Sequence, residues 1–223
     1  MDLETEFGAI DIYLFDQILR GRITARDRIL DAGCGMGRNL VFFLRQGYDV
    51  FGLDADPDAI AETRSLAAHL APGLDPDRFR IESVAAPTFA DAFASVVISS
   101  AVLHFAQNAS EFERMLAGTW RLVAPGGMLF CRLASTIGME NRVRAIGPAG
   151  RYRLPDGTDR YLVDEMQLLD LTERLGGALL DPIKTSVVQN QRSMTTWVVR
   201  KRRAAESVIR STARRSPRRS ARR

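Results

Sequence analysis

The pattern of apolar positions switches repeatedly between strand-like runs and helical spacing over the first 134 residues. Phe7, Ile10, Leu14 and Ile18 recur at helical spacing and predict an amphipathic opening helix. Short β-forming runs then alternate with further helical patterns, and proline or glycine marks many of the boundaries. We expect strands at residues 28–32, 48–53, 79–83, 94–99 and 128–133, and helices at residues 40–44, 57–69 and 110–120.

This alternation predicts a parallel sheet with helices on both faces and right-handed crossovers between neighbouring strands. The run at residues 94–99 is almost continuously apolar, as expected for a strand that is buried on both faces. Ser110 and Glu113 have the spacing of a capping box, which would begin the helix that follows them.

The pattern changes beyond residue 134. Residues 155–157 read Pro-Asp-Gly, a turn signal that predicts a loop or an irregular hairpin at residues 152–161. A helix is expected at residues 164–175, and two further strands at residues 179–188 and 194–200 close the predicted domain.

Charge divides the chain into two unequal parts. The whole chain has a formal net charge of +4, but residues 200–223 alone hold eleven basic residues and one acidic residue. We therefore expect a mildly acidic domain at residues 1–199 and a basic, arginine-rich tail at residues 200–223. The tail has too little apolar area to fold, so disorder is expected, and non-specific contact with nucleic acid is open to it.

Cysteine and histidine are scarce, which excludes several classes of site. Cys34 and Cys131 are too few for a disulfide framework, and with only His69 and His104 beside them no metal site is expected. No apolar run approaches the roughly 18 residues needed to span a bilayer, and the acidic N-terminus is unlike a signal peptide. We expect a soluble, cytoplasmic protein with reduced cysteines.

The segment at residues 31–39, Asp-Ala-Gly-Cys-Gly-Met-Gly-Arg-Asn, lies between the first strand and the next helix. Its glycines let backbone amides approach a ligand at the carboxyl edge of the sheet, where ligands of open α/β sheets bind. A dinucleotide fingerprint would need glycine at position 38, where Arg38 stands, so a nicotinamide cofactor is disfavoured. Asp54 ends the second strand, where a carboxylate can accept hydrogen bonds from ribose hydroxyls. The glycine-rich loop and the Asp54 carboxylate together indicate a ligand that contains a nucleoside.

Residues 29–37 and 50–56, together with Leu-Val-Ala-Pro-Gly-Gly-Met-Leu-Phe at residues 122–130, resemble the class I S-adenosylmethionine (SAM)-dependent methyltransferases. The resemblance covers roughly residues 5–200. Within the class, residues 37–39 and 46–50 are similar to the tellurite-resistance and thiopurine-type small-molecule methyltransferases. The family implies a Rossmann-like α/β fold with a seven-stranded, mostly parallel sheet whose last strand is antiparallel.

The resemblance also implies a set of cofactor contacts. Asp31, Gly33 and Gly35 would shape the pocket for the methionine end of SAM, and Asp54 would bind the ribose. Many relatives carry an acidic residue near the adenine, at the place where Ser83 and Val84 stand here. The implied cofactor-binding residues are Asp31, Gly33, Cys34, Gly35, Gly37, Asn39, Asp54, Ala55, Asp56, Ser83, Val84, Ser99 and Ser100.

Methyl transfer from a sulfonium is an in-line displacement, so the protein mainly aligns the reactants. His104, just past the fourth strand, is the best candidate for a general base, the alternative being a role in packing and hydrogen bonding. Four arginines, Arg38, Arg151, Arg153 and Arg160, are candidate contacts for an anionic substrate, the alternative being a solvated loop.

A SAM-dependent methyltransferase acting on a small molecule is the leading hypothesis. The Asn-Pro-Pro-Tyr motif of many nucleic-acid amino-methyltransferases is absent, and Ser-Ser-Ala-Val-Leu-His stands in its place at residues 99–104. Two alternatives remain. One is an RNA- or ribosome-associated methyltransferase that is anchored by the basic tail, and the other is a non-catalytic SAM-binding protein on the same fold.

Overall fold

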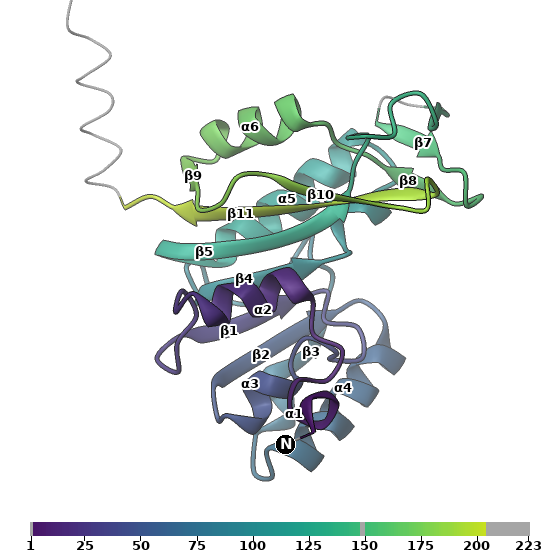
Figure 1. The fold of residues 1–223 in the computed structure, drawn as a ribbon. Helices are drawn as coiled ribbons and strands as arrows, with labels where there is room; N and C mark the ends of the chain where they lie inside the picture. The colour runs from purple at the N-terminus through teal and green to yellow at the C-terminus, as the bar shows by residue number, and fades with distance from the viewer. Residues whose placement is uncertain (1, 148–149, 204–223) are drawn as a thin grey trace, which may run out of the picture.

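The computed structural model describes residues 2–147 and 150–203 of the chain. One sheet runs through the whole molecule in the strand order β10-β11-β5-β4-β1-β2-β3, with β9 paired to β11 outside this path (Figure 1). Its strands are β1 (Arg28–Ala32), β2 (Asp49–Asp54), β3 (Phe79–Ile81), β4 (Ala94–Ser100), β5 (Val123–Ala134), β9 (Gly177–Leu179), β10 (Lys184–Val188) and β11 (Arg192–Lys201).

The sheet is parallel from β3 to β5 and antiparallel at its far end. β1 pairs in parallel with β2 and β4, and so do β2 with β3 and β4 with β5. The last strand, β11, is antiparallel to β5 and to β10. The predicted class I fold is therefore confirmed. The expected strand at residues 179–188 is instead two strands, β9 and β10, which gives the sheet eight strands in place of seven.

Helices cover both faces of the sheet. Buried side chains of α2, α3 and α4 pack on one face, and those of α5 and α6 pack on the other. Figure 1 shows α2 in front of the sheet and α5 behind it. The α-helices are α1 (Leu3–Phe7), α2 (Ile12–Leu19), α3 (Val41–Arg45), α4 (Pro57–Leu70), α5 (Ala109–Leu122) and α6 (Glu165–Arg174), and two 3-10 turns are η1 (Pro76–Arg78) and η2 (Leu103–Phe105).

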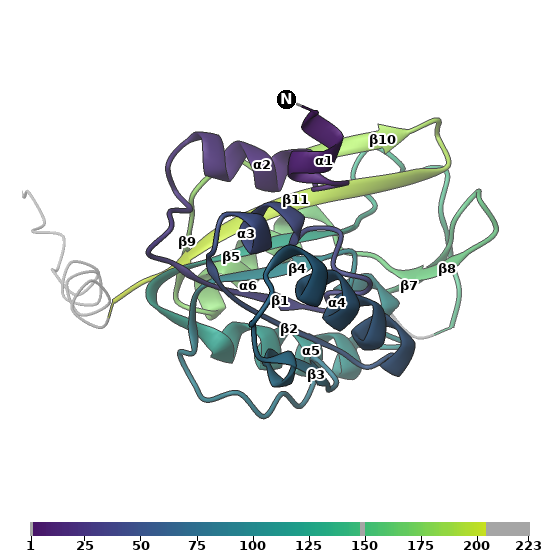
Figure 2. The ribbon, with the colours of Figure 1, turned by 90° about the horizontal axis from the view of Figure 1, so that it is seen from below.

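Helix α2 comes close to β10, although the two are far apart in the sequence (Figure 2), whereas α1 packs beside α3. The Tyr13 hydroxyl is 2.9 Å from that of Ser186. The predicted single opening helix is wrong, because Gly8 adopts a left-handed φ of +59° and Asp11 begins a second helix as its N-cap. The buried Asp11 carboxylate thereby comes to lie within 2.9 Å of the Arg132 guanidinium on β5.

The start of α5 also differs from the prediction. Asn108 is the N-cap, and its side chain accepts a hydrogen bond of 2.9 Å from the Glu111 amide. The Glu111 carboxylate in turn accepts from the Gln107 amide at 2.7 Å. The capping pair is therefore Asn108 and Glu111, and Ser110 lies inside the helix, so the predicted Ser110–Glu113 box is wrong.

The hairpin expected at residues 152–161 is present as a small separate sheet of β6 (Arg144–Ala145), β7 (Arg151–Arg153) and β8 (Asp159–Tyr161). It packs against η2, which follows β4 at the carboxyl edge of the main sheet. At the other edge, β11 continues to Lys201, whose Nζ donates to the carbonyl oxygens of Trp120 and Val123. The first two residues of the predicted tail thus belong to the sheet, and residues 204–223 lie outside the described part.

No helix within residues 2–147 and 150–203 is long and apolar enough to cross a membrane.

Candidate functional site

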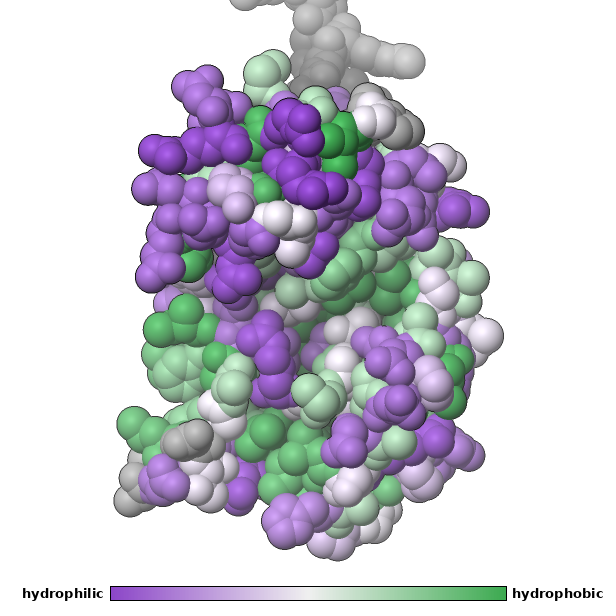
Figure 3. Space-filling view, turned by 90° about the vertical axis from the view of Figure 1, so that its right-hand side faces the viewer, coloured by the Kyte–Doolittle hydropathy of each residue, from purple (hydrophilic) through white to green (hydrophobic). Residues whose placement is uncertain are grey.

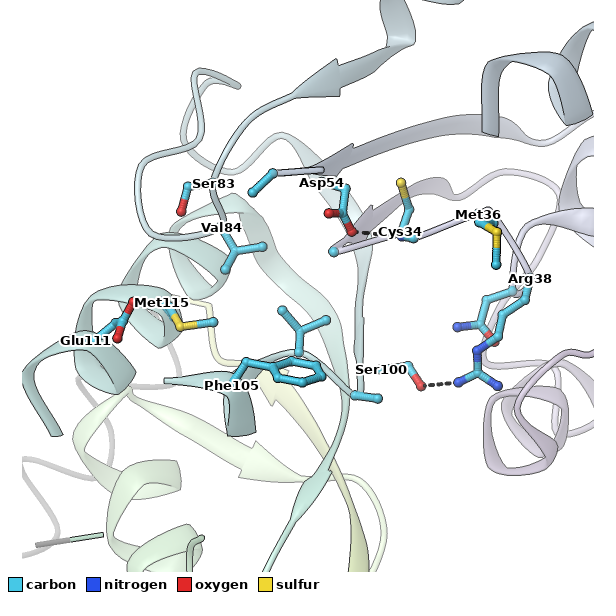
Figure 4. Close-up of a pocket in the computed structure, with 16 residues that line it drawn as sticks. Cys34, Met36, Arg38, Asp54, Ser83, Val84, Ser100, Phe105, Glu111 and Met115 are labelled. Atoms are coloured by element: carbon cyan, nitrogen blue, oxygen red, sulfur yellow. Dashed lines mark hydrogen bonds between the residues drawn. The ribbon is translucent and has the colours of Figure 1, made fainter. Parts of the chain in front are cut away.

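Two adjoining cavities open at the carboxyl edge of the sheet. The first encloses about 490 Å³ and lies over the loops that follow β1, β2, β3 and β4 (Figure 4). Figure 3 shows this face of the molecule, where apolar residues line a hollow across its middle and hydrophilic residues dominate the surface above it. Ten residues that the sequence singled out line this first cavity: Gly33, Cys34, Gly35, Arg38, Asn39, Asp54, Ala55, Ser83, Val84 and Ser100.

The glycine-rich loop is held by backbone hydrogen bonds to the end of β2. The amides of Gly33 and Cys34 both donate to the Leu53 carbonyl, at 2.8 and 3.0 Å. Gly33 has a φ of +86°, and a Cβ there would lie 2.4 Å from the Val102 side chain. Gly35 also has a positive φ, +53°, but nothing lies within 4 Å of its Cβ position. Of these two glycines, Gly33 alone needs glycine for both its conformation and its surroundings.

Asp54 is fixed at the mouth of the first cavity. Its Oδ2 accepts a hydrogen bond of 2.9 Å from the Gly35 amide, and its Oδ1 accepts one of 3.0 Å from the Asp56 amide. Each carboxylate oxygen keeps further acceptor capacity, so the group is oriented to receive the two neighbouring hydroxyls of a ribose.

Asp31 lies beneath the loop and is 1% exposed. Neither carboxylate oxygen has a hydrogen-bond partner among the described residues. Burial raises the pKa of this carboxyl to about 8, although the positive charge of Arg38 acts in the opposite direction. A buried carboxyl without a partner is costly, and a cationic ligand group above it would remove part of that cost.

The other predicted cofactor residues shape the loop or the fold without lining the cavity. Gly37 has a φ of +78° and packs against α4, and the exposed Asp56 is the N-cap of that helix. Ser99 is fully buried. Asn39, which does line the cavity, also accepts a hydrogen bond from the Asp11 amide at 3.0 Å. The thiol of Cys34 is buried, and burial raises its pKa, so it is no nucleophile.

The far end of the first cavity was only partly predicted. Ser83 and Val84 lie there as expected, and α5 adds Glu111 and Met115 from the opposite wall (Figure 4). Met115 is buried with the core face of α5, and part of its surface also faces the cavity. Glu111 was missed because its spacing marks it as an ordinary first-turn acid. The residues that line this cavity outside the prediction are Met36, Ala101, Val102, Phe105, Glu111 and Met115.

The second cavity encloses about 350 Å³ and shares Arg38, Ala101 and Phe105 with the first. Ala101 adopts a left-handed φ of +66°, an uncommon conformation for a residue with a side chain, at the junction of the two cavities. Arg38 donates to the Ser100 hydroxyl at 3.1 Å. The shared wall places a ligand in one cavity directly beside a ligand in the other.

Of the four arginines proposed for substrate binding, the structure brings two to the second cavity, Arg38 and Arg160. Arg153 instead forms an ion pair with Asp159, and Arg151 donates to the Ala106 carbonyl at 3.3 Å. These two residues hold the β7–β8 hairpin in place. Two arginines that the sequence did not single out, Arg132 on β5 and Arg192 on β11, complete the cationic lining.

His104 also lines the second cavity and is 6% exposed. The Ala134 amide donates to its Nδ1 at 3.2 Å. Burial, together with the positive charges of Arg160, Arg132 and Arg192, lowers the pKa of the imidazole to about 4. The ring is therefore neutral near pH 7.

Among residues 2–147 and 150–203, no group of three or more histidine, cysteine or acidic side chains has an arrangement that could hold a metal ion. The two cavities present different sets of groups to a ligand. The first cavity offers backbone amides, carboxylates and apolar walls, and the second offers guanidinium groups and one imidazole.

Comparisons with known proteins agree with this geometry. A family model described as a methyltransferase domain matches residues 29–127. A SAM-dependent methyltransferase from Methanosarcina mazei has a similar structure, with a TM-score of 0.66 and 20% identity, covering 83% of this chain and 97% of that one. No match is found among curated protein sequences.

Two further similar structures contain bound ligands. The 1,6-didemethyltoxoflavin-N1-methyltransferase of Burkholderia thailandensis, with 1,6-didemethyltoxoflavin and S-adenosylhomocysteine bound, has a TM-score of 0.63 and 21% identity, covering 90% of this chain and 81% of that one. The magnesium protoporphyrin IX methyltransferase of Synechocystis PCC 6803, with SAM bound, has a TM-score of 0.61 and 18% identity, covering 86% and 77%. At these identities the likeness concerns the fold.

Proposed function

We propose that this chain, which has the class I fold and matches a methyltransferase-domain model over residues 29–127, is a SAM-dependent methyltransferase that methylates a small molecule bound in the second cavity. The observation that carries the proposal is the wall of Arg38, Ala101 and Phe105 that the two cavities share. A methyl donor in the first cavity and an acceptor in the second would meet across this wall, as an in-line displacement requires.

The residues of the first cavity fit SAM. The Asp54 carboxylate would accept hydrogen bonds from the ribose hydroxyls, because the amides of Gly35 and Asp56 already fix its orientation. Asp31, buried without a partner, would stabilise the ammonium group at the methionine end. When bound, SAM supplies an activated methyl group on a sulfonium.

The adenine would lie between Val84 and Met115 at the apolar end. Ser83 stands where many relatives carry an acidic residue, and its hydroxyl already accepts a hydrogen bond from the Ala85 amide at 3.2 Å. Glu111 faces the same end from α5, with one carboxylate oxygen bound to the Gln107 amide. We assign its other oxygen as the acceptor for the exocyclic amino group of adenine.

The dimensions of the second cavity favour a small acceptor. It is bounded by the β7–β8 hairpin and by residues on either side of the β10–β11 turn, and about 350 Å³ is enough for a compact ring system. The similar Burkholderia enzyme holds 1,6-didemethyltoxoflavin together with S-adenosylhomocysteine. The resemblance of residues 37–39 and 46–50 to the tellurite-resistance and thiopurine-type enzymes also favours a small acceptor.

Positioning is the main contribution of the protein to the reaction. Correct alignment of two bound reactants can supply about 7–11 kcal/mol of the barrier reduction. The left-handed Ala101 and the rigid loop that ends at Arg38 would fix the distance between the two ligands.

The alternative, an RNA-associated methyltransferase, rests on the basic segment at residues 200–223. The described start of this segment, up to Arg203, lies at the amino edge of the sheet, where Arg203 lines a different cavity with Arg22 and Gly126. The candidate acceptor site is at the opposite edge. RNA binding that weakens with salt and disappears on removal of residues 204–223 would favour this alternative.

Two measurements test the proposed function. Calorimetric titration of the full chain with S-adenosylhomocysteine should show binding, and NAD, as the control ligand, should show none. A screen of small acceptors with methyl-labelled SAM should then find transfer. If a folded sample binds S-adenosylhomocysteine but methylates only RNA, the RNA-associated alternative replaces this proposal. If a folded sample binds neither S-adenosylhomocysteine nor NAD, the chain is a non-catalytic relative.

A further inference from the structure

The lining of the second cavity is strongly cationic. Arg38, Arg132, Arg160 and Arg192 face it, against a single carboxylate, that of Asp156. The Asp156 carboxylate is already engaged, because it accepts hydrogen bonds from the amide and the hydroxyl of Thr158 at 2.9 and 2.6 Å. The positive charge around the cavity is therefore largely uncompensated on its own walls.

Several donors of these arginines are unused. Arg132 binds the buried Asp11 carboxylate through one nitrogen at 2.9 Å, but its Nε is buried without a partner. The guanidinium of Arg192 has no hydrogen bond or ion pair to any described residue, and only its charge acts on Asp156. Arg160 lies 4.9 Å above the Phe105 ring and donates one hydrogen bond, to the Asp159 carbonyl. A ligand in the cavity would meet planar groups with free N–H donors, which suit an oxyanion.

His104 adds a donor of fixed direction. Its Nδ1 accepts the Ala134 N–H, so in the neutral ring the proton resides on Nε2. No described residue accepts a hydrogen bond from Nε2. A second proton on the ring would have to bind Nδ1, which faces the Ala134 N–H. The resulting positive charge would also be repelled by Arg132, Arg160 and Arg192. The residue that the sequence suggested as a general base is thus arranged as a hydrogen-bond donor.

We propose that the second cavity binds the acceptor as an anion, held by Arg132, Arg160 and Arg192 and by the Nε2–H of His104. This inference rests on the proposed function, since it names the chemical class of the acceptor. Arg38 and Phe105, at the shared wall, orient the nucleophilic atom toward the first cavity.

An anionic acceptor also removes the need for a base. Its nucleophilic atom forms the new bond to the methyl carbon, the carbon–sulfur bond breaks, and the electron pair of that bond neutralises the sulfonium. No proton has to leave. A carboxylate, a phenolate or a thiolate meets this requirement, and the arginines stabilise the ionised form of a weakly acidic acceptor. A protonated amine would be repelled by the arginines and by the sulfonium.

The first experiment compares two probes of nearly equal size, benzoate and benzamide, which differ in charge. Each is titrated by ligand-observed NMR into the full chain saturated with S-adenosylhomocysteine. We expect benzoate to bind about tenfold more tightly than benzamide, because only benzoate forms charge-assisted hydrogen bonds. Equal affinities, or no binding of benzoate, would overturn the proposal. Absence of S-adenosylhomocysteine binding is a separate result, which would remove the proposed function itself.

Two matched variants locate the anion. Arg192→Gln should weaken benzoate binding about tenfold and leave S-adenosylhomocysteine affinity unchanged. Arg174→Gln, on the exposed side of α6, is the control, because Arg174 pairs with Glu113 and lies outside both cavities. If both variants weaken benzoate binding equally, the effect is general charge attraction and the anion site is rejected. Thermal unfolding checks that both variants fold.

The role of His104 has a readout of its own. The chain contains two histidines, so nitrogen-15 NMR of the imidazoles gives two sets of signals, and a His69→Asn variant assigns them. The His104 ring should stay neutral from pH 8 to pH 5, with the proton on Nε2, and its Nε2 signal should shift when benzoate binds. A ring that carries its proton on Nδ1 would contradict its assignment as a donor to the acceptor.

Discussion

The two cavities are built in different ways. The first takes most of its polar contacts from the backbone and from residues at the ends of β1 and β2, and its glycine-rich loop is fixed by hydrogen bonds to Leu53 and Asp54. The second takes its polar contacts from side chains on β5, β8 and β11 and from η2. A site made of backbone geometry suits one invariant ligand, whereas a site made of long side chains can change its ligand through single substitutions. The comparison teaches that the proposed cofactor site and the proposed acceptor site depend on different features of the sequence.

The largest expected effect comes from disturbing the backbone of the first cavity. Gly33→Ala should abolish S-adenosylhomocysteine binding and lower the free energy of unfolding by about 2–4 kcal/mol, because it combines a left-handed φ with a Cβ 2.4 Å from Val102. Gly35→Ala is the matched control. Gly35 has a positive φ, but nothing lies near its Cβ position, so Gly35→Ala should lower the free energy of unfolding by only about 1 kcal/mol. Equal losses in chemical denaturation would show that the clash with Val102 is unimportant.

A smaller effect is expected from Asp54. Asp54→Ala should weaken S-adenosylhomocysteine binding about 100-fold, since it removes the carboxylate that we propose binds the ribose and also the acceptor that fixes the Gly35 amide. Asp58→Ala, an exposed residue in the first turn of α4, is the control and should bind normally. Unchanged affinity in folded Asp54→Ala, measured by calorimetry, would refute the ribose assignment.

The two cavities should also give pH dependences of opposite sign. The pKa of His104 is lowered to about 4, from about 6.5 in an unfolded chain, so the unfolded state binds the proton first. Its contribution to stability is present above pH 6.5 and is lost as the pH falls toward 4, by at most about 1.4 kcal/mol per pH unit. Asp31, with a raised pKa of about 8, contributes stability at low pH that is lost as the pH rises through 8.

Denaturation at several pH values tests this contrast with His104→Gln and Asp31→Asn. The difference in unfolding free energy between wild type and His104→Gln should change between pH 6.5 and 4, and that between wild type and Asp31→Asn should change between pH 4 and 8. A difference that stays constant with pH for either variant would show that the buried group has an ordinary pKa.

The smallest expected effect concerns the adenine end. Glu111→Gln should weaken S-adenosylhomocysteine binding about tenfold, because a carboxylate acceptor for the amino group is lost. S-inosylhomocysteine, which has an oxo group in place of that amino group, should bind both proteins equally. Glu113→Gln on the same helix is the control, since Glu113 pairs with Arg174. A tenfold loss of affinity for both ligands would show that the substitution acts by disturbing the N-terminal cap of α5 and not through a contact with the amino group.

The sequence predicted the first cavity better than the second for a physical reason. Gly33, Gly35 and Asp54 act through local backbone geometry at strand ends, and their spacing along the chain reveals it. Arg132 and Arg192 approach the same cavity only because β11 pairs antiparallel to β5, a long-range contact that no local pattern contains.

The prediction also erred at other positions. Arg151 and Arg153 share a short segment with residues near the cavity, but their side chains hold the hairpin together. The helix start at Asn108 was missed because two overlapping capping patterns compete, and the Glu111 amide takes the asparagine oxygen. The mostly parallel sheet with an antiparallel last strand was predicted through the family resemblance, and the structure confirms both features.

The most direct test of the two-cavity account is calorimetric titration of S-adenosylhomocysteine into the full chain and into its Asp54→Ala and Arg192→Gln variants. The account predicts binding to the wild type and to Arg192→Gln with the same affinity, and a loss of about 100-fold in Asp54→Ala. Binding that falls equally in both variants would contradict the central claim, because the two cavities would then not be separate sites for donor and acceptor.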